Sequence, residues 1–156
     1  MAASSRTGMA SDLGLLVARI LLGAIFAAHG YQKLVTFGLA GATESFRGMG
    51  VPAPEIAAPV VAIVELVGGI ALIAGAFTGI VGLLLAIDML VAALLVHLPQ
   101  GVFIDAGGWE LVGALGAGAL AIAAVGVGTR ADIARRIIEA GGSLTSISMD
   151  RSSLDE

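Results

Sequence analysis

Three ionisable residues lie inside long apolar runs of the chain, where a charge needs a partner. They are Arg19, Glu65 and Asp88. A charge within membrane hydrocarbon costs roughly 2.5–3.5 kcal/mol on insertion scales, so such side chains face one another, a ligand or water. Two neighbouring carboxylates in a low dielectric tend to share a proton. This set is compatible with proton handling, and also with a structural ion pair that fixes the packing of helices.

A second group of polar and aromatic residues flanks the ends of the apolar runs. Its members are His29, Lys33, His97, Trp109 and Glu110. We expect them to line one mouth on the outer face, as a candidate site. For Trp109 an interfacial anchor at the start of a span is an equally ordinary role. A histidine at such a boundary is more often capped or hydrogen-bonded than a ligand.

The two histidines raise the question of haem or metal binding. His29 and His97 could in principle be two axial haem ligands. However, His97 follows Asp88 by nine residues, about 180° around an ideal helix, so both cannot face the bundle axis unless the helix bends near Pro99. Two histidines without a carboxylate at metal-ligand spacing do not indicate a metal site. We therefore predict neither haem nor metal.

The apolar runs are long enough to cross a bilayer. Of 156 residues, 58% are hydrophobic and 13% charged, and the mean hydropathy is +1.01. Four segments of about 17–22 residues match a hydrocarbon core of roughly 30 Å; they cover residues 13–34, 56–77, 80–98 and 111–127. Arg19 interrupts the first run, which favours a retained membrane helix over a cleaved signal peptide. The sequence predicts an all-α, transmembrane four-helix bundle.

Positive charge is concentrated towards the two ends of the chain. The residues outside the spans there are Arg6, Arg130, Arg135, Arg136 and Arg151. The loops between spans hold only Lys33 and Arg47. Because positive segments stay on the cytoplasmic side, we predict an N-in, C-in, multi-pass protein of the inner (plasma) membrane. Two segments then share the outer face: a long loop over residues 35–55, punctuated by glycine and proline, and residues 99–109.

The residues beyond the fourth span differ in character from the bundle. Residues 130–140 read as a short amphipathic helix lying on the cytoplasmic membrane surface. They complete a bundle domain over residues 1–140. Residues 141–156 are Ser-rich and small, which predicts a flexible tail.

Small residues mark the faces on which membrane helices can approach closely. At 100° per residue, Arg19 shares a face with Gly23, Phe26, Gly30 and Lys33. Glu65 shares a face with Ala58, Gly69, Leu72 and Ala76. Glu110 shares a face with Ala114, Ala117, Ala121, Ala124 and Gly128.

Depth along the helices suggests how the buried charges pair. At 1.5 Å per residue, Arg19, Asp88 and Glu65 lie roughly 10, 12 and 16–18 Å from the inner edges of their helices. One arginine at that depth can reach both carboxylates. We therefore expect Arg19 to pair with Glu65, Asp88 or both inside the bundle.

Taken in order, the polar and glycine landmarks form a recognisable pattern. They are Arg19 with Leu22-Gly23, Phe26 and His29-Gly30-x-x-Lys33-Leu34; Phe46-x-x-Met49-Gly50; Glu65-Leu66-x-Gly68-Gly69; Asp88-Met89 with Val96-His97; and Gly107-Gly108-Trp109-Glu110. The pattern resembles the DoxX family of four-helix bacterial membrane proteins, over about residues 13–128. The resemblance implies a membrane protein related to subunits of quinone-linked or oxidative-stress oxidoreductase complexes, although more distant relatives resemble cargo receptors and assembly chaperones.

Two functions of different class therefore stay open. In the first, the chain is a subunit of an oxidoreductase complex whose bundle binds a quinone or lipid-like ligand. In the second, it is a non-enzymatic scaffold, chaperone or cargo receptor with structural buried charges. The chain has no cysteine, so thiol chemistry would come from a partner. Membrane lipid and a protein partner or second copy are the expected partners. Nucleic acid is not, because the chain has no basic stripe.

Overall fold

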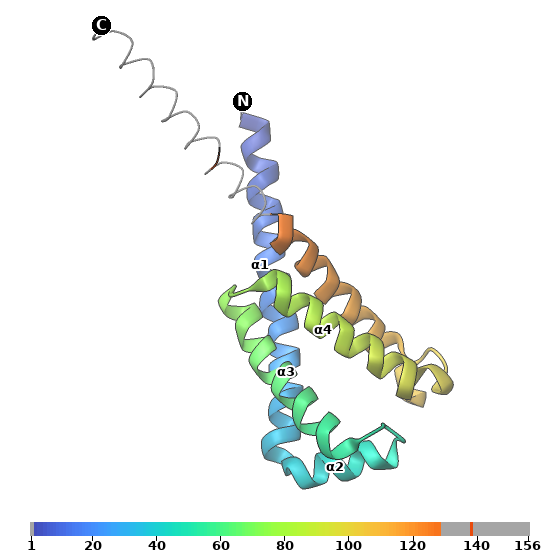
Figure 1. The fold of residues 1–156 in the computed structure, drawn as a ribbon. Coiled ribbons are helices and arrows are strands. Elements are labelled where there is room, and N and C mark those ends of the chain that lie inside the picture. The colour runs from blue at the N-terminus through green and yellow to red at the C-terminus, as the bar shows by residue number, and fades with distance from the viewer. Residues whose placement is uncertain (1, 129–137, 139–156) are drawn as a thin grey trace, which may run out of the picture.

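The computed structural model describes residues 2–128 and residue 138. Its labelled α-helices are α1 (Ala2–Tyr31), α2 (Gly38–Gly48), α3 (Pro54–Ala74) and α4 (Thr78–Ala92). A further helix, Glu110–Gly128, closes the described bundle. Figure 1 shows the start of α1 and the Gly128 end of the last helix at the same end of the bundle.

Four helical segments are long and apolar enough to cross a membrane. They are Ser11–Thr36, Pro54–Ala74, Thr78–Gln100 and Glu110–Gly128, and each boundary lies within three residues of the predicted one. The all-helical, four-span prediction is therefore confirmed. The predicted surface helix over residues 130–140 lies outside the described residues, apart from Ile138, and so does the predicted tail over residues 141–156.

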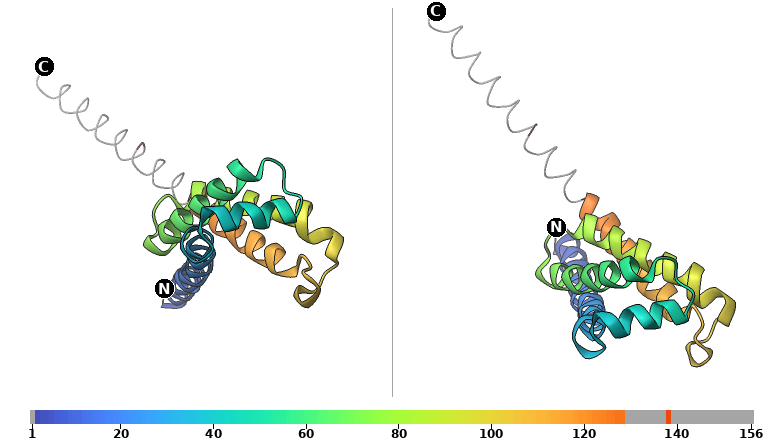
Figure 2. Two further views of the ribbon diagram at one scale, coloured as in Figure 1. Left: turned by 90° about the horizontal axis from the view of Figure 1, so that it is seen from below. Right: turned by 60° about the horizontal axis from the view of Figure 1, so that its bottom comes forward.

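The segment predicted as a long loop contains a helix, so that prediction is wrong. α2 turns its buried Ala42 and half-buried Phe46, one turn apart, towards the bundle. On its exposed side Arg47 pairs with Glu44 one turn earlier and, at 2.5 Å, with Glu55 at the start of α3. Packing and the local ion pairs thus outweigh the glycines that suggested a loop. α2 lies across the end of the bundle opposite the chain start (Figures 1 and 2).

Two of the spanning helices widen into π turns near that end. α1 continues as a π turn over Gln32–Thr36, and α4 as a π turn over Ala93–His97. The chain then forms 3-10 turns at Leu98–Gln100 and Ile104–Ala106 before the last helix begins. In a π turn the backbone bonds run from residue i to i+5, so each residue rotates less than in an α-helix.

Glycines allow α1 and α3 to pack backbone to backbone. A Cβ at Gly30 would lie 2.3 Å from the Leu66 nitrogen, and one at Gly23 would lie 2.6 Å from the Gly69 oxygen. The predicted small-residue faces of these two helices are thus the contact faces. Phe26 and Leu72 complete this interface and are almost fully buried.

The small-residue face predicted for the last helix is wrong. Its alanines at 114, 117, 121 and 124 are exposed, and so is Gly128. The buried side carries Leu115, Ala119, Ile122 and Ala123 instead. Gly82 of α4 packs there, because a Cβ at Gly82 would lie 2.7 Å from the Ala119 oxygen. This helix carries small residues on all of its sides, so their positions do not identify the contact face. The large apolar side chains of the buried side identify it instead.

The α1–α3 interface predicts a sharp difference between two glycines of α1. Gly30→Ala places a methyl group against the backbone of Leu66, whereas Gly14 has nothing within 4 Å of its Cβ position. We expect Gly30→Ala to destabilise the fold by about 1–3 kcal/mol or more through overpacking, and Gly14→Ala to be neutral or slightly stabilising. Thermal unfolding in mild detergent measures both. Equal melting temperatures would contradict the close packing.

The predicted orientation is open to a labelling test, because the chain has no cysteine. Glu44→Cys on α2 and Ala106→Cys before the last helix are exposed at one end of the bundle, and Ser11→Cys is exposed near the other. With the N-terminus inside, a membrane-impermeant thiol reagent should label the first two in intact cells and not the third. Labelling of Ser11→Cys alone would invert the orientation.

Candidate functional site

A cavity of about 320 Å³, here called the central cavity, lies in the half of the bundle nearer α2. α3 and α4 meet at their connecting turn (residues 75–77) and diverge from it in a V, with α2 across its open end (Figure 1). All four spans and α2 contribute to the wall. Its apolar side chains include Phe26, Phe46, Met49, Met89, Leu111 and Leu115.

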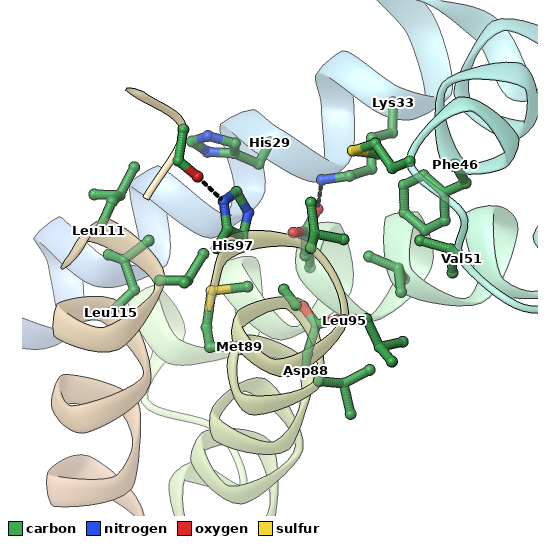
Figure 3. Close-up of a pocket in the computed structure, with 18 of the residues that line it drawn as sticks. His29, Lys33, Phe46, Val51, Asp88, Met89, Leu95, His97, Leu111 and Leu115 are labelled. Carbon is green, nitrogen blue, oxygen red and sulfur yellow. Dashed lines mark hydrogen bonds and ion pairs between the residues drawn. The ribbon is translucent and has the colours of Figure 1, made fainter. Parts of the chain in front are cut away.

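An ion pair lies in the wall of this cavity. The Lys33 ammonium donates a hydrogen bond to the Glu65 carboxylate (Figure 3). Glu65 is 3% exposed and is the one fully buried charged residue of the described chain. Such a carboxylate is stable as an anion only with a partner. α1 supplies that partner from its π turn, through Lys33 rather than through the predicted Arg19.

The expectation that Arg19 pairs with Glu65 or Asp88 is not met. α1 and α3 run antiparallel, and Gly30 of α1 lies beside Leu66 of α3. Residues that precede Gly30 in α1 therefore lie beside residues that follow Leu66 in α3. Arg19 accordingly lies against Gly75, where a Cβ would be 2.8 Å from Nη2. At 1.5 Å per residue, Gly75 is roughly 15 Å along α3 from Glu65, too far for an ion pair.

Asp88 of α4 lines the same cavity as the ion pair (Figure 3). Its Oδ2 is buried and has no hydrogen-bond partner within the described part of the chain. The site thus holds one basic and two acidic side chains, the predicted charge set with Lys33 in place of Arg19. An unpartnered carboxyl oxygen in an apolar wall is stabilised by carrying a proton or by receiving a donor from a ligand.

Both histidines also reach the cavity, against the expectation for His97. The α4 backbone changes to a π turn at Ala93, before Pro99, which reduces the rotation between Asp88 and His97, and both side chains line the cavity. His97 Nδ1 is 2.7 Å from the Gly107 oxygen and His29 Nδ1 is 2.9 Å from the Ile25 oxygen. Each ring therefore keeps Nε2 for another partner.

The remaining two residues of the predicted mouth lie beside the cavity rather than in its wall. Glu110 Oε1 accepts a hydrogen bond of 2.7 Å from the Ile104 nitrogen, which ties the preceding segment to the last helix. The Trp109 indole covers Gly113, one turn along. Both residues therefore act on the shape of the segment that closes the cavity. Among the described residues, no group of three or more His, Cys, Asp or Glu gathers as a metal site would need.

Some features of the site were not recognised from the sequence. Phe46 and Met49 bring α2 into the cavity wall; the sequence carried them only as landmarks of the family pattern. The sequence does contain a signal for the Lys33–Glu65 pair. Gly30 lies one turn before Lys33, and its close approach to α3 near Glu65 places the two charged residues on facing turns.

Comparison with known proteins identifies the family. The profile of the DoxX family matches residues 14–98, more than half of the chain. The chain belongs to the DoxX family. The matched region holds α2, α3, α4 and all three charged residues of the central cavity, together with both of its histidines.

Two curated relatives match slightly more than half of this chain. A protein of Bacillus subtilis (strain 168) named "Putative oxidoreductase CatD" is 36% identical over 87 residues, which are 56% of this chain and 62% of that protein. "Inner membrane protein YqjF" of Escherichia coli (strain K12) is 37% identical over 86 residues, 55% of this chain and 63% of that protein. The chain thus spans about three fifths of the length of these relatives. No solved structure matches it significantly.

The family and the four apolar spans settle the setting of the site. The chain is a multi-pass protein of the inner (plasma) membrane. Glu65 and Asp88 of the central cavity lie near the middle of their spans and so within the membrane, whereas Lys33 lies near the end of the first span.

The buried pair predicts an asymmetric response to mutation. Lys33→Met leaves the Glu65 carboxylate buried without its partner, so we expect a loss of about 3–5 kcal/mol in stability. The double variant Lys33→Met, Glu65→Gln removes both charges and should recover most of that loss. Arg47→Met is the control, because its pairs are exposed and contribute little. Equal melting of Lys33→Met and Arg47→Met in detergent would contradict a buried pair.

Proposed function

We propose that this chain is the membrane subunit of an oxidoreductase complex, and that the central cavity binds a quinone or a related lipid-like molecule. The observation that carries the proposal is the buried, unpartnered Asp88 Oδ2 beside the Lys33–Glu65 pair in an otherwise apolar wall. Such a wall suits a ligand that is mostly apolar and has a few polar atoms at one place.

The size and position of the cavity support a ligand of this class. At about 320 Å³ it lies at the lower end of the range for small-molecule sites, roughly 300–1,000 Å³. Val61 of α3 and Leu95 of α4 line it from the two arms of the V. A ring-shaped head group can occupy the cavity while an apolar tail extends between these arms into the lipid. A water-soluble substrate would gain nothing from such an exit.

The polar groups suit a head group with carbonyl oxygens. The Lys33 ammonium has three donors, of which one serves Glu65. A protonated Asp88 offers a further donor from the same wall. Reduction of a quinone to a quinol takes two electrons and two protons. Asp88 is the residue that would pass protons to the ring, and the electrons would come from a redox-active partner subunit, since this chain has no cysteine to hold an iron–sulfur centre.

The name of the Bacillus subtilis relative agrees with a redox setting, whereas the Escherichia coli name gives only a location. The competing function is a scaffold, chaperone or receptor in which the same charges only hold helices together. The two functions differ in what co-purifies. Protein extracted in mild detergent should carry quinone, detected by mass spectrometry of the extracted lipid, if the first is right. A stoichiometric protein partner with no quinone would support the second.

Asp88→Asn separates proton transfer from structure, because the amide keeps the shape of the carboxyl group. We expect the variant to fold and to retain quinone, while quinone-linked turnover of the purified complex falls by about 10²-fold or more, the contribution of a positioned acid–base group. Asp12→Asn, at an exposed position of α1 outside the cavity, is the matched control.

Two outcomes would contradict a role of Asp88 in proton transfer. Normal turnover of Asp88→Asn and of Glu65→Gln would remove both carboxylates from proton transfer and leave the scaffold function ahead. Loss of folding in Asp88→Asn, with Asp12→Asn unaffected, would show that the carboxyl group is structural.

A further inference from the structure

A second cavity lies at the other end of the bundle, beside the α3–α4 turn. Its volume is about 250 Å³, and it is here called the turn cavity. α1, the turn, the start of α4 and the last helix all contribute to its wall. Among the described residues that line it, Arg19 is the one charged side chain, and none is a carboxylate. The turn cavity is therefore positively charged and separate from the central cavity.

Arg19 keeps hydrogen-bonding capacity in this position. Its guanidinium lies over Gly75, which has φ +74° and leaves no room for a Cβ. The Nε atom is buried and has no hydrogen-bond partner within the described part of the chain. Capping the end of α3 does not account for this, because the Leu72 and Ala71 oxygens already accept from the Gly75 and Ala76 nitrogens. A buried donor without a hydrogen-bond partner destabilises the fold, and a charged donor does so more strongly.

A second source of positive potential faces the same space. α4 begins at Thr78, which lines the turn cavity, and its N-cap residue Phe77 has no side-chain oxygen to offer the first turn. The N-terminus of a helix carries about half a positive charge. The C-terminus of α3 lies at the same turn, and its partial negative charge faces the Arg19 guanidinium at Gly75. The guanidinium itself is therefore the main positive charge of the turn cavity. Asp12, the nearest acidic residue of α1 in sequence, is exposed and does not line this cavity.

The turn cavity also lies at a level where anionic groups are present. The second span ends at Ala74 and the third begins at Thr78, at the end of the bundle where α1 starts (Figure 1). We therefore place this turn near the boundary between hydrocarbon and head groups. Beyond the last helix the sequence adds Arg130, Arg135 and Arg136. Basic pockets between membrane helices on the cytoplasmic side are typical binding sites for anionic lipid head groups.

We propose that the turn cavity binds the phosphate group of an anionic phospholipid from the leaflet at this end of the bundle. The guanidinium of Arg19 contacts the phosphate oxygens, and a planar guanidinium matches two of them at once. Leu15, Ile122 and Val125 supply apolar wall for the glycerol and the first acyl carbons. The site does not depend on the ligand of the central cavity, so either proposal can fail alone.

The test is native mass spectrometry of the purified full chain, titrated with phosphatidylglycerol, phosphatidylcholine or sodium phosphate. The wild type should retain phosphatidylglycerol at least tenfold better than phosphatidylcholine, and Arg19→Gln should lose that preference. Arg47→Gln, an exposed arginine at the opposite end, should keep it. Arg19→Lys keeps the positive charge but lacks the planar guanidinium with its paired donors, so this variant should bind phosphatidylglycerol with intermediate strength.

Leu15→Phe keeps the proposal testable if Arg19→Gln does not fold. It adds bulk to the wall of the turn cavity and leaves the guanidinium in place, so it should also weaken phosphatidylglycerol retention. Retention of the lipid by Arg19→Gln or by Leu15→Phe at the wild-type level would overturn the proposal, as would an equal loss in Arg47→Gln. Binding of sodium phosphate at millimolar concentration that is lost in Arg19→Gln, together with equal retention of the two lipids, would assign the site to a soluble phosphate instead.

Discussion

The backbone contact between α1 and α3 is the constraint on which the rest of the structure depends. Gly23, Gly30 and Gly69 leave no room for a side chain at the crossing, so the two helices have one register in which they fit. In a membrane no hydrophobic effect drives helices together, and close van der Waals contact between small residues supplies the association energy. A shift by one turn would press backbone atoms against side chains and lose that contact.

The same register separates the two positive charges of α1. Lys33 meets Glu65 at the central cavity, and Arg19 meets Gly75 at the α3–α4 turn. Phe26 and Leu72 fill the interface between them and exclude water from both sides. Each charge thus lines a cavity of its own. The bundle has an ion pair with an extra carboxyl group within the membrane, and a guanidinium at its boundary.

The sequence predicted the spans and the charged residues closely, but not how the charges pair. Counted from the start of the apolar run near Leu13, the depth of Arg19 is close to that of Asp88, and Glu65 is within reach of its side chain. α1 extends beyond the α3–α4 turn, so the edge of its apolar run is not the edge of the bundle. Register is a property of two helices in contact, and it follows from the glycine pairs rather than from either helix alone. For the last helix, with small residues on every side, even the contact face was undetermined.

The π turns were beyond sequence reasoning, yet the central cavity depends on them. A regular α-helix would place His97 about 180° from Asp88, facing lipid. The π turn over Ala93–His97 reduces the rotation per residue, and both side chains line the central cavity. The His97 ring is hydrogen-bonded to the Gly107 oxygen, and this bond positions the segment before the last helix over the cavity. A π turn interrupts the regular α-helical hydrogen bonds and is frequent at functional sites. Its presence where α4 bounds the cavity therefore favours a site shaped for a ligand over one that merely packs.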